Sequence, residues 1–264
     1  MANTEDFRGK WALVTGASAG IGKAIAIELA SHGAKLILTA RRKERLEALA
    51  AELRAKGTEV RIVLADLTQP NAPKEIFEAT EGAGFPVEIL INNAGLGQYG
   101  NFATCDLGQE ISQVRVNCEA VVHLTRLFVP AMVERKRGWV LVVASTASFQ
   151  PVPFLSTYAA TKAFDRFFAL GLAEEVQPFG IRVTALCPGP TESEFFDVAG
   201  AAKFKTHRAQ SAEEVARLGL ESLANGKRKI IPNFGGQITA MLVRFLPISL
   251  ITFFVAKAAR PKPV

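Results

Sequence analysis

The chain has 264 residues, of which 49% are hydrophobic and 21% charged, and its net charge is +6 at pH 7. This balance is typical of a globular protein, and the length suits one large α/β domain. A basic chain can bind nucleic acid, but here the lysines and arginines are spread over predicted helices and no basic run alternates with aromatic residues. We therefore expect no nucleic-acid binding.

The cysteines and the first residues both indicate a cytoplasmic protein. Cys105, Cys118 and Cys187 lie far apart in the sequence and show no spacing typical of a metal or redox pair. We therefore predict reduced thiols and no metal site. Residues 1–14 contain acidic side chains where an export signal has basic ones, and the apolar run behind them is short. We expect no export signal.

Short apolar runs recur along the chain, with helical segments between them. WALVT at 11–15 precedes a predicted helix at 20–31, and KLILT at 35–39 precedes a charged helix at 42–56. Further strands are predicted at 59–65, 87–91, 139–144, 181–187 and 229–231. Most runs are continuously apolar, which is typical of parallel strands covered on both faces. The alternation predicts an α/β fold in one domain, 1–264, with a doubly wound, mostly parallel sheet of about seven strands and helices on both faces.

The first strand leads into a glycine turn, TGASAGIG at 15–22. Glycines permit a tight turn and a close approach of the backbone to a ligand, and the helix that follows offers free N–H groups to a pyrophosphate. Such a turn can also be an ordinary connection between a strand and a helix. Its position after the first strand favours a dinucleotide site. The predicted contacts in this turn are Gly16, Ser18, Gly20, Ile21 and Gly22.

The second strand ends in Ala40, Arg41 and Arg42. A protein that holds the ribose of NAD usually has an acidic residue near this position. A guanidinium matches a 2′-phosphate instead. The sequence therefore predicts that NADP(H) is preferred and leaves NAD(H) open as a second cofactor. The alternative is that both arginines begin a solvated helix.

Polar or glycine-rich clusters follow the later strands as well. Asp66 ends the third strand, the sequence NNAG at 92–95 ends the fourth, and Ser145 ends the fifth. CPGPTES at 187–193 follows the sixth. Because the carboxyl ends of parallel strands share one edge of a sheet, where ligands bind, we expect all these clusters to lie together.

On these motifs the chain resembles the single-domain short-chain dehydrogenases/reductases, which have the Rossmann fold. The resemblance covers about residues 8 to 234 and includes TGASAGIG, NNAG, Asn117, Ser145, the YAATK sequence of Tyr158 and Lys162, and PG at 188–189. Ser145 and Tyr158 are 13 residues apart, which is the usual separation in that family. The sequences VASTASFQP, YAATKAF and VTALCPGPTESEF in the second half of the chain resemble those of a bacterial branch of largely uncharacterised oxidoreductases.

The resemblance implies four catalytic residues, Asn117, Ser145, Tyr158 and Lys162. Tyr158 would exchange a proton with the substrate oxygen, which Ser145 would hydrogen-bond. Lys162, one helical turn away, would lower the pKa of Tyr158 and hold the nicotinamide ribose. Asn117 would support a water chain to Lys162 through a local irregularity in its helix.

Several of these residues have a structural alternative. Ser145 could cap the backbone, with Thr146 or Ser148 as the functional hydroxyl, Asn117 could be a buried helix asparagine, and Asp66 could be a turn residue.

The resemblance also implies cofactor contacts beyond the glycine turn and the two arginines. They are Asp66, Leu67, Asn93, Ala94, Gly95, Tyr158, Lys162, Pro188, Gly189, Thr191 and Ser193. Asp66 would contact the adenine ring, and Thr191 and Ser193 could reach the carboxamide. Ala19 departs from the pattern, because many NADP-preferring members carry a basic residue there. The preference for NADP then depends on Arg41 and Arg42.

The implied function is an NADP(H)-dependent oxidoreductase that interconverts a carbonyl and a secondary alcohol by hydride transfer. The alternative is a dinucleotide-binding sensor or scaffold with weak catalysis. Phe149 and Phe154 suggest a hydrophobic small-molecule substrate, although both rings could be core residues. A homodimer or homotetramer is expected by resemblance. Its interface would include Phe164, Phe167 and Phe168, on the helix that carries Tyr158.

Residues 237–264 form a strongly apolar segment that ends in basic residues. Arg244 and Pro247 interrupt it, and the uninterrupted part, 245–256, is too short to cross a bilayer, which needs about 20 apolar residues. Three alternatives stay open. The segment packs on the fold or on a partner subunit, it lies in a membrane interface with its basic tail toward anionic lipid, or it closes over a greasy substrate pocket.

Overall fold

The computed structural model describes residues 4–204 and 209–261. Its seven strands form one parallel sheet in the order β3-β2-β1-β4-β5-β6-β7. The strands are β1 (Trp11–Thr15), β2 (Lys35–Ala40), β3 (Val60–Leu64), β4 (Val87–Asn92), β5 (Gly138–Val143), β6 (Ile181–Leu186) and β7 (Lys229–Ile230). The predicted parallel sheet is confirmed. Several strand boundaries differ from the predicted ones by one residue: β3 and β6 end one residue earlier than predicted, whereas β2 and β4 end one residue later.

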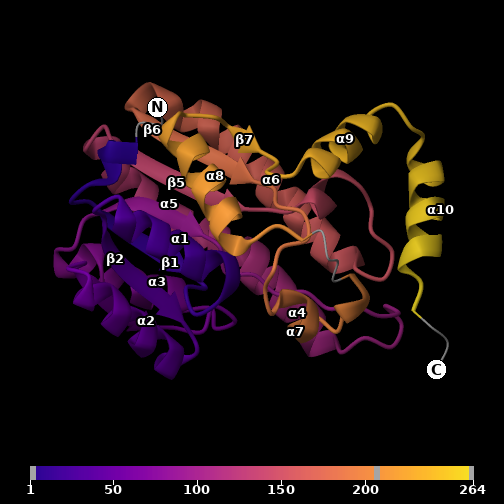
Figure 1. Cartoon of the computed structure of the whole chain (residues 1–264), viewed down its shortest axis with the longest axis horizontal. Coiled ribbons are helices and arrows are strands. Elements are labelled where there is room, and N and C mark those ends of the chain that lie inside the picture. The colour runs from indigo at the N-terminus through magenta and orange to yellow at the C-terminus, as the bar shows by residue number, and fades with distance from the viewer. Residues whose placement is uncertain (1–3, 205–208, 262–264) are drawn as a thin grey trace.

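Helices cover both faces of this sheet (Figure 1). One face carries α1 (Gly20–Ser31), α2 (Lys43–Ala55) and α8 (Ala212–Ala224). The other face carries α3 (Ala72–Glu78), α5 (Ala120–Glu134) and α6 (Ser156–Val176). The remaining helices are α4 (Leu107–Val114), α7 (Phe195–Val198), α9 (Phe234–Leu242) and α10 (Ile248–Ala259), with short 3-10 turns at Thr4–Phe7, Glu81–Ala83, Thr146–Phe149, Gln177–Phe179 and Ala202–Phe204.

Alternate residues of each strand enter different cores. In β1, Ala12 and Val14 pack with α1, α2 and α8, whereas Trp11 and Leu13 pack with the helices of the opposite face. Successive side chains of a strand point to opposite faces, so a strand buried on both sides must be apolar throughout. This is why the strands read as uninterrupted apolar runs in the sequence.

One helical stretch of the described chain, Leu107–Glu134, is long and apolar enough to span a membrane by length and composition alone. It contains α4, a π-helical turn at Arg115–Glu119 and α5. Val121, Leu124 and Phe128 of this stretch are buried against the sheet, as in a core helix.

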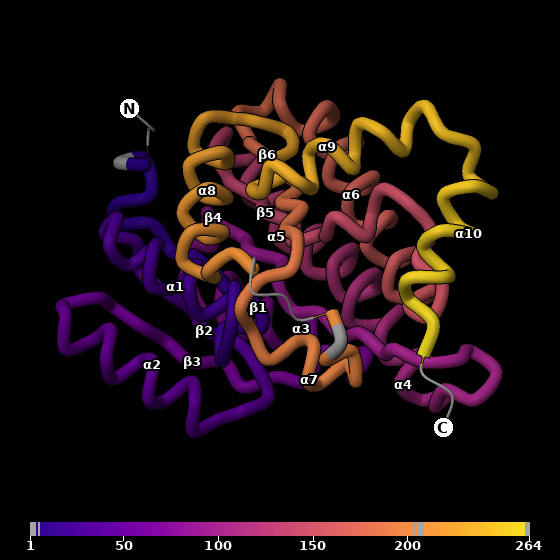
Figure 2. The backbone as a smooth tube through the Cα atoms, turned by 45° about the vertical axis from the view of Figure 1, so that its right-hand side comes forward, coloured from indigo at the N-terminus to yellow at the C-terminus, as the bar shows by residue number. Residues whose placement is uncertain are grey.

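The chain ends in an arm formed by α9 and α10. Both helices lie at the margin of the molecule, beyond α6, with α10 turning back toward α4 (Figures 1 and 2). Tyr99, in the loop after β4, ties down the end of the arm, because its hydroxyl donates to the carbonyl of Ala259 at 2.8 Å. Residues 262–264 of the predicted C-terminal segment lie outside the described residues.

Candidate active site

The carboxyl ends of the strands open onto one long cavity of about 770 Å³. The predicted cofactor contacts all line it, and so does Ser145. These contacts are Gly16, Ser18, Gly20, Ile21, Gly22, Arg41, Arg42, Asp66, Leu67, Asn93, Ala94, Gly95, Tyr158, Lys162, Pro188, Gly189, Thr191 and Ser193. The clusters that follow separate strands therefore do share one edge of the sheet. What each of these residues binds stays a prediction.

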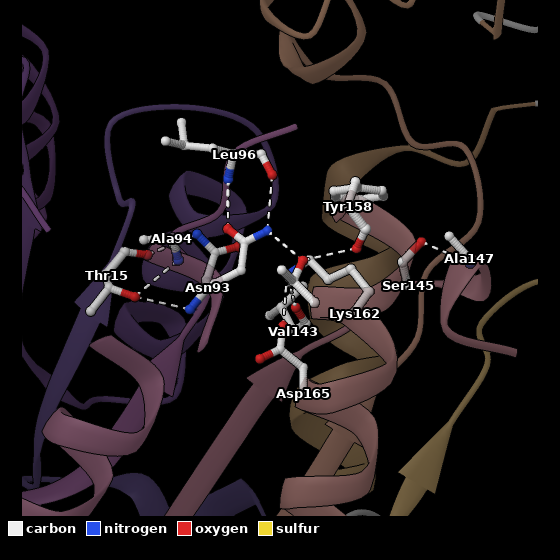
Figure 3. Close-up of polar contacts among 12 residues, drawn as sticks. Thr15, Asn93, Ala94, Leu96, Val143, Ser145, Ala147, Tyr158, Lys162 and Asp165 are labelled. Atoms are coloured by element: carbon white, nitrogen blue, oxygen red, sulfur yellow. Dashed lines mark hydrogen bonds and ion pairs between the residues drawn. The ribbon is translucent and has the colours of Figure 1, made fainter. Parts of the chain in front are cut away.

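Thr15, at the end of β1, ties the first strand to the loop after β4. Its hydroxyl donates to the carbonyl of Ile91 at 3.0 Å and accepts from the N–H groups of Asn93 and Ala94 at 2.9 and 3.0 Å. The Asn93 amide donates back to the Thr15 carbonyl at 2.8 Å (Figure 3). These bonds fix the cavity floor between two neighbouring strands.

The turn between β1 and α1 has the form that a pyrophosphate needs. Gly16 and Gly20 have φ values of +67° and +52°, a left-handed conformation that favours glycine. A Cβ on Gly22 would lie 2.3 Å from the Asn93 amide nitrogen, so only glycine lets the turn pack on the loop after β4. Ala19 at the N-cap of α1 has no side-chain group that could bind the first N–H groups of the helix. Those groups can therefore bind an anion, and the turn fits a dinucleotide.

Arg42, just before α2, turns back toward this glycine turn. Its Nε and Nη2 atoms donate to Ser18 Oγ at 3.2 and 3.0 Å, and its Nη1 donates to Glu194 Oε2 at 2.7 Å. Arg41 lines the cavity beside it. Arg42 is therefore more than a solvated helix start, because its guanidinium is held at the cavity wall.

Asp66 and Ser145 each combine a local structural role with a place in the cavity. Asp66 Oδ1 accepts from the backbone N–H two residues further on at 3.0 Å. Ser145 Oγ accepts from the N–H of Ala147 at 3.1 Å and so caps the short 3-10 turn after β5. Of the alternative hydroxyls, Thr146 also lines the cavity, whereas Ser148 is buried outside its lining.

Tyr158 lies on α6, close to Ser145 and one turn before Lys162 (Figure 3). Burial raises the pKa of the Tyr158 phenol above its ordinary value, while the Lys162 ammonium and a hydrogen bond with Ser145 lower it by less. Lys162 therefore lowers the pKa of Tyr158, as predicted, although burial outweighs this effect and the net shift is upward. A phenol that keeps its proton is suited to donate one.

Two buried acceptors hold the Lys162 ammonium. Its Nζ donates to the carbonyl of Val143 at 2.7 Å and to Asp165 Oδ2 at 2.9 Å (Figure 3). The lysine and the aspartate are only 4% and 1% exposed. Burial alone would lower the pKa of Lys162, but Asp165 and Tyr158 more than offset this and raise it. Lys162 is therefore a cation at neutral pH.

Asn117 lies in the π-helical turn between α4 and α5, so the expected helix irregularity is present. Its side chain is fully buried behind the cavity. Its Oδ1 accepts from the N–H of Leu96 at 2.8 Å, and its Nδ2 donates to the Leu96 carbonyl and to Thr161 Oγ1, both at 2.9 Å. Asn117 thus locks the loop after β4 against α6. Its part in a water chain stays a prediction.

The far half of the cavity has an apolar wall. Phe195 and Phe196 of α7 line it together with Val152 and Leu155. The Phe195 ring packs on the ring of Tyr158, with 5.0 Å between the ring centroids. Aromatic and aliphatic side chains therefore surround the place where a substrate would meet the tyrosine.

The suggestion that Phe149 and Phe154 contact the substrate is wrong. Neither side chain lines the cavity. Phe149 packs on the core beneath Arg166, whose guanidinium lies 4.4 Å from the ring centroid. Phe154 has a φ of +69°, and its carbonyl accepts from Gly100 at 2.9 Å, so it belongs to a tight turn.

Sequence reasoning missed several residues of the site. Asp165 had a visible signal, since it is an acidic residue three positions after Lys162 on the same helix. Asn233 packs against Gly189, and a Cβ there would lie 2.1 Å from its amide nitrogen, yet no motif marks it in the sequence. The other missed lining residues include Gln150, Val152, Leu155, Glu194, Phe195, Phe196, Gly236 and Thr239.

The sequence and the fold of the chain match those of known proteins. The model of the short chain dehydrogenase family matches residues 10–233. The chain belongs to this family. It is an NAD(P)-dependent dehydrogenase or reductase, and the predicted family and enzyme class are confirmed.

Curated relatives include very-long-chain 3-oxoacyl-CoA reductases. The protein of Anas platyrhynchos is 33% identical over 226 residues, which is 83% of this chain and 72% of that protein. The protein of Podospora anserina is 38% identical over 180 residues, 67% of this chain and 53% of that protein. The match therefore spans only about half the length of the latter relative.

Solved structures are similar over most of the chain. A short-chain dehydrogenase from Sphingobium yanoikuyae in complex with NADPH has a TM-score of 0.82 and 30% identity, and the match covers 97% of this chain and 98% of that chain. One from Burkholderia phymatum in complex with NAD has a TM-score of 0.80 and 26% identity, with 89% and 93% covered. Both bind a nicotinamide dinucleotide, and they differ in which one.

We predict that Asp165 gives the pH profile of turnover an acid limb. Burial raises the pKa of the Asp165 carboxyl to about 6, against the opposing pull of Lys162. Below that pH the carboxyl gains a proton, and the ammonium loses its counter-charge. Activity should therefore fall as pH drops through about 6, and Asp165→Asn should remove this limb and lower activity at neutral pH.

The measurement is kcat/KM from pH 5 to pH 9. Glu175→Gln is the matched control, because Glu175 is an exposed carboxylate on the same helix. An acid limb that survives unchanged in Asp165→Asn would contradict this role.

Proposed function

We propose that the chain is an NADPH-dependent reductase that converts a hydrophobic ketone into a secondary alcohol, with Tyr158 as the general acid. The observation that supports this most directly is the shared cavity. Ser145 and Tyr158 lie in it between a glycine-lined half that suits a dinucleotide and an apolar half that suits a lipophilic substrate. The reduced nicotinamide, when bound, supplies the hydride.

Ser145 and Tyr158 act on the substrate oxygen. The Ser145 hydroxyl donates a hydrogen bond to the carbonyl oxygen and holds it where negative charge develops. The Tyr158 hydroxyl gives its proton to that oxygen while the carbonyl carbon accepts the hydride, so C=O becomes CH–OH. The Lys162 ammonium stabilises the phenolate left behind, which then regains a proton from water.

A preference for NADP(H) is supported by Arg42, because two hydrogen bonds to Ser18 Oγ hold its guanidinium beside the glycine turn. A guanidinium fork and a hydroxyl together match the oxygens of a 2′-phosphate. Arg41 adds a second positive charge on the same cavity wall. NAD(H) fits the same cavity but lacks the phosphate that these groups would bind.

The substrate class that we propose is a long-chain 3-oxoacyl thioester. The apolar wall of Phe195, Phe196, Val152 and Leu155 supports a long hydrocarbon tail. The names of the curated relatives in Anas platyrhynchos and Podospora anserina, very-long-chain 3-oxoacyl-CoA reductases, support the same class.

Tyr158→Phe should lower kcat by roughly 10²–10⁴-fold, the usual contribution of a general acid, and leave NADPH affinity nearly unchanged. The assay follows NADPH absorbance with 3-oxoacyl thioesters of increasing chain length. Tyr99→Phe is the matched control, because Tyr99 is the only other tyrosine of the sequence. Turnover by Tyr158→Phe equal to that of the unaltered chain would favour a dinucleotide-binding sensor or scaffold.

The chain should also form a homodimer through the outer face of α5 and α6. Phe167 and Phe164 on α6 are 64% and 39% exposed, and Val122 is exposed on α5, which covers the same face of the sheet. Phe168, the third aromatic residue predicted for this face, instead packs toward the core. Exposed aromatic and aliphatic side chains on adjoining helices are typical of a subunit interface.

Phe167→Glu should convert the dimer to a monomer or weaken it at least tenfold, because the glutamate would have to be buried without a partner. Sedimentation velocity over a concentration series measures this. Leu64→Glu at the opposite edge of the sheet adds the same charge to an exposed apolar site and should leave the dimer intact. A dimer equally stable in both variants would place the interface elsewhere.

The C-terminal arm should contact a membrane surface while the rest of the protein is cytoplasmic. Of the large hydrophobic side chains exposed in the described chain, half lie in α9, α10 and their connection. They are Phe234, Ile238, Met241, Leu242, Phe245, Leu246, Ile248, Leu250, Phe253 and Phe254. No acidic residue follows Glu221 in the sequence, whereas Arg244, Lys257 and Arg260 are all exposed. An apolar face with basic residues and no acidic ones complements anionic lipid.

Vesicle flotation tests this contact. The chain should float with vesicles that contain about 30% anionic lipid and bind neutral vesicles much more weakly, since each basic residue near such a surface adds about 1 kcal/mol. Phe253→Glu with Phe254→Glu should reduce flotation at least tenfold. Phe179→Glu, an exposed phenylalanine outside the arm, is the control. If the double variant still floats but loses its dimer, the arm covers a second copy of the chain instead.

A further inference from the structure

The loop after β6 carries a carboxylate to the cavity wall that is proposed to bind the 2′-phosphate. Glu194 Oε2 accepts from Arg42 Nη1 at 2.7 Å, and Glu194 Oε1 accepts from Arg45 Nη1, also at 2.7 Å. Glu194 follows Arg42 by 152 positions in the sequence, so only the fold brings the two side chains together. One carboxylate therefore bridges two guanidinium groups of the segment that begins α2.

This bridge uses the donors that a phosphate would use. Arg42 already commits Nε and Nη2 to Ser18 Oγ, so Nη1 is the donor that it turns toward Glu194. Hydrogen bonds from Arg42 and Arg45 hold the pKa of the Glu194 carboxyl below its usual value, so this group is an anion at neutral pH. Carboxylate and phosphate oxygens are alternative partners for the same guanidinium.

The bridge is also easy to exchange. The side chains of Glu194, Arg42 and Arg45 are between 42% and 47% exposed. An ion pair so open to solvent is weak, because water and salt compete for both charges. A dianionic phosphate that reaches Arg42 can therefore replace the carboxylate.

Glu194 lies between the two halves of the site. A Cβ on Gly20, in the glycine turn, would come within 3.0 Å of Ser193 Cβ, and Phe195 packs on Tyr158. The three consecutive loop residues thus touch the cofactor side, the arginine pair and the catalytic tyrosine.

We propose that Glu194 is a cofactor-specificity residue, whose carboxylate is an internal counter-anion for Arg42 and Arg45 and competes with the 2′-phosphate of NADP(H). NAD(H) has a neutral 2′-hydroxyl and does not compete for these donors. The inference rests on the proposed use of NADP(H) at this site. It places Arg45 in the phosphate pocket and identifies Glu194 as the group that limits the preference for NADP(H).

The test measures binding of two nucleotide fragments by calorimetry, without turnover. The fragments are 2′,5′-ADP, which carries the 2′-phosphate, and 5′-ADP, which lacks it. In Glu194→Gln the affinity for 2′,5′-ADP should rise about five- to tenfold, while the affinity for 5′-ADP stays within twofold, because only the first fragment meets the removed charge.

Glu192→Gln is the matched control. Glu192 is an exposed carboxylate on the same loop, and it makes no ion pair within residues 4–204 and 209–261. It should change neither affinity by more than twofold. An equal gain in both variants, no gain in Glu194→Gln, or weaker binding of 2′,5′-ADP by that variant would each overturn the competition.

Failure of the proposed cofactor preference gives a different result. If Arg42→Ala left the affinity for 2′,5′-ADP unchanged, the arginine pair would not be a phosphate pocket, and the preference for NADP(H) would lose its basis. If Arg42→Ala weakened that binding and Glu194→Gln had no effect, only the role of Glu194 would be refuted.

Discussion

The geometry of the site depends on the two hydrogen bonds of the buried Lys162 ammonium. A charge removed from water must be paired and hydrogen-bonded, or its burial costs several kcal/mol. Here the two acceptors are the carbonyl of Val143, at the end of β5, and the carboxylate of Asp165, on α6. Meeting this requirement holds α6 against the end of β5. Ser145 follows that strand end and Tyr158 precedes Lys162 by one turn, so the same constraint sets the distance between the serine and the tyrosine.

Burial also explains why the pKa of Tyr158 differs from that expected for an exposed tyrosine–lysine pair on a helix face. An exposed lysine one turn away would pull the pKa of a tyrosine down. In the folded chain, burial acts on both groups, and the carboxylate of Asp165 opposes the lysine in its effect on Tyr158. The result is a neutral phenol beside a persistent cation. This combination favours proton donation followed by stabilisation of the phenolate, which is the order that carbonyl reduction needs.

Much of the fold could be predicted because its signals are local. A strand buried on both faces must be apolar at every position, so runs such as residues 11–15 mark the sheet directly. The glycine turn and the YAATK sequence were equally readable, since backbone conformation and helical spacing are local properties. Glu194 could not be identified, because its partners Arg42 and Arg45 lie 152 and 149 positions away and only the tertiary fold brings them together. Asp165 was missed for another reason: Lys162 lies three positions before it on the same helix, but an acidic residue at that spacing does not by itself indicate a buried pair. The roles of Phe149 and Phe154 were misjudged because the turn after β5 decides which way those rings point.

The loop after β6 lies where the polar and the apolar parts of the cavity meet. The polar half of the cavity depends on glycines and strand ends that the sheet fixes rigidly, whereas the apolar wall comes from α7 and the residues around it. Thr191 and Gly189 shape the start of that loop through a bond of 3.0 Å from the threonine hydroxyl to the glycine carbonyl. Phe195 and Phe196 then follow within a few residues. A loop anchored at the sheet and apolar at its tip can adapt to different hydrocarbon tails without moving Ser145 or Tyr158, because Ser145 lies just after β5 and Tyr158 on α6, and neither is on the loop. In the proposed reaction, the sheet and the buried ammonium fix the positions of the catalytic groups, while the loop, a segment that can vary, selects the substrate.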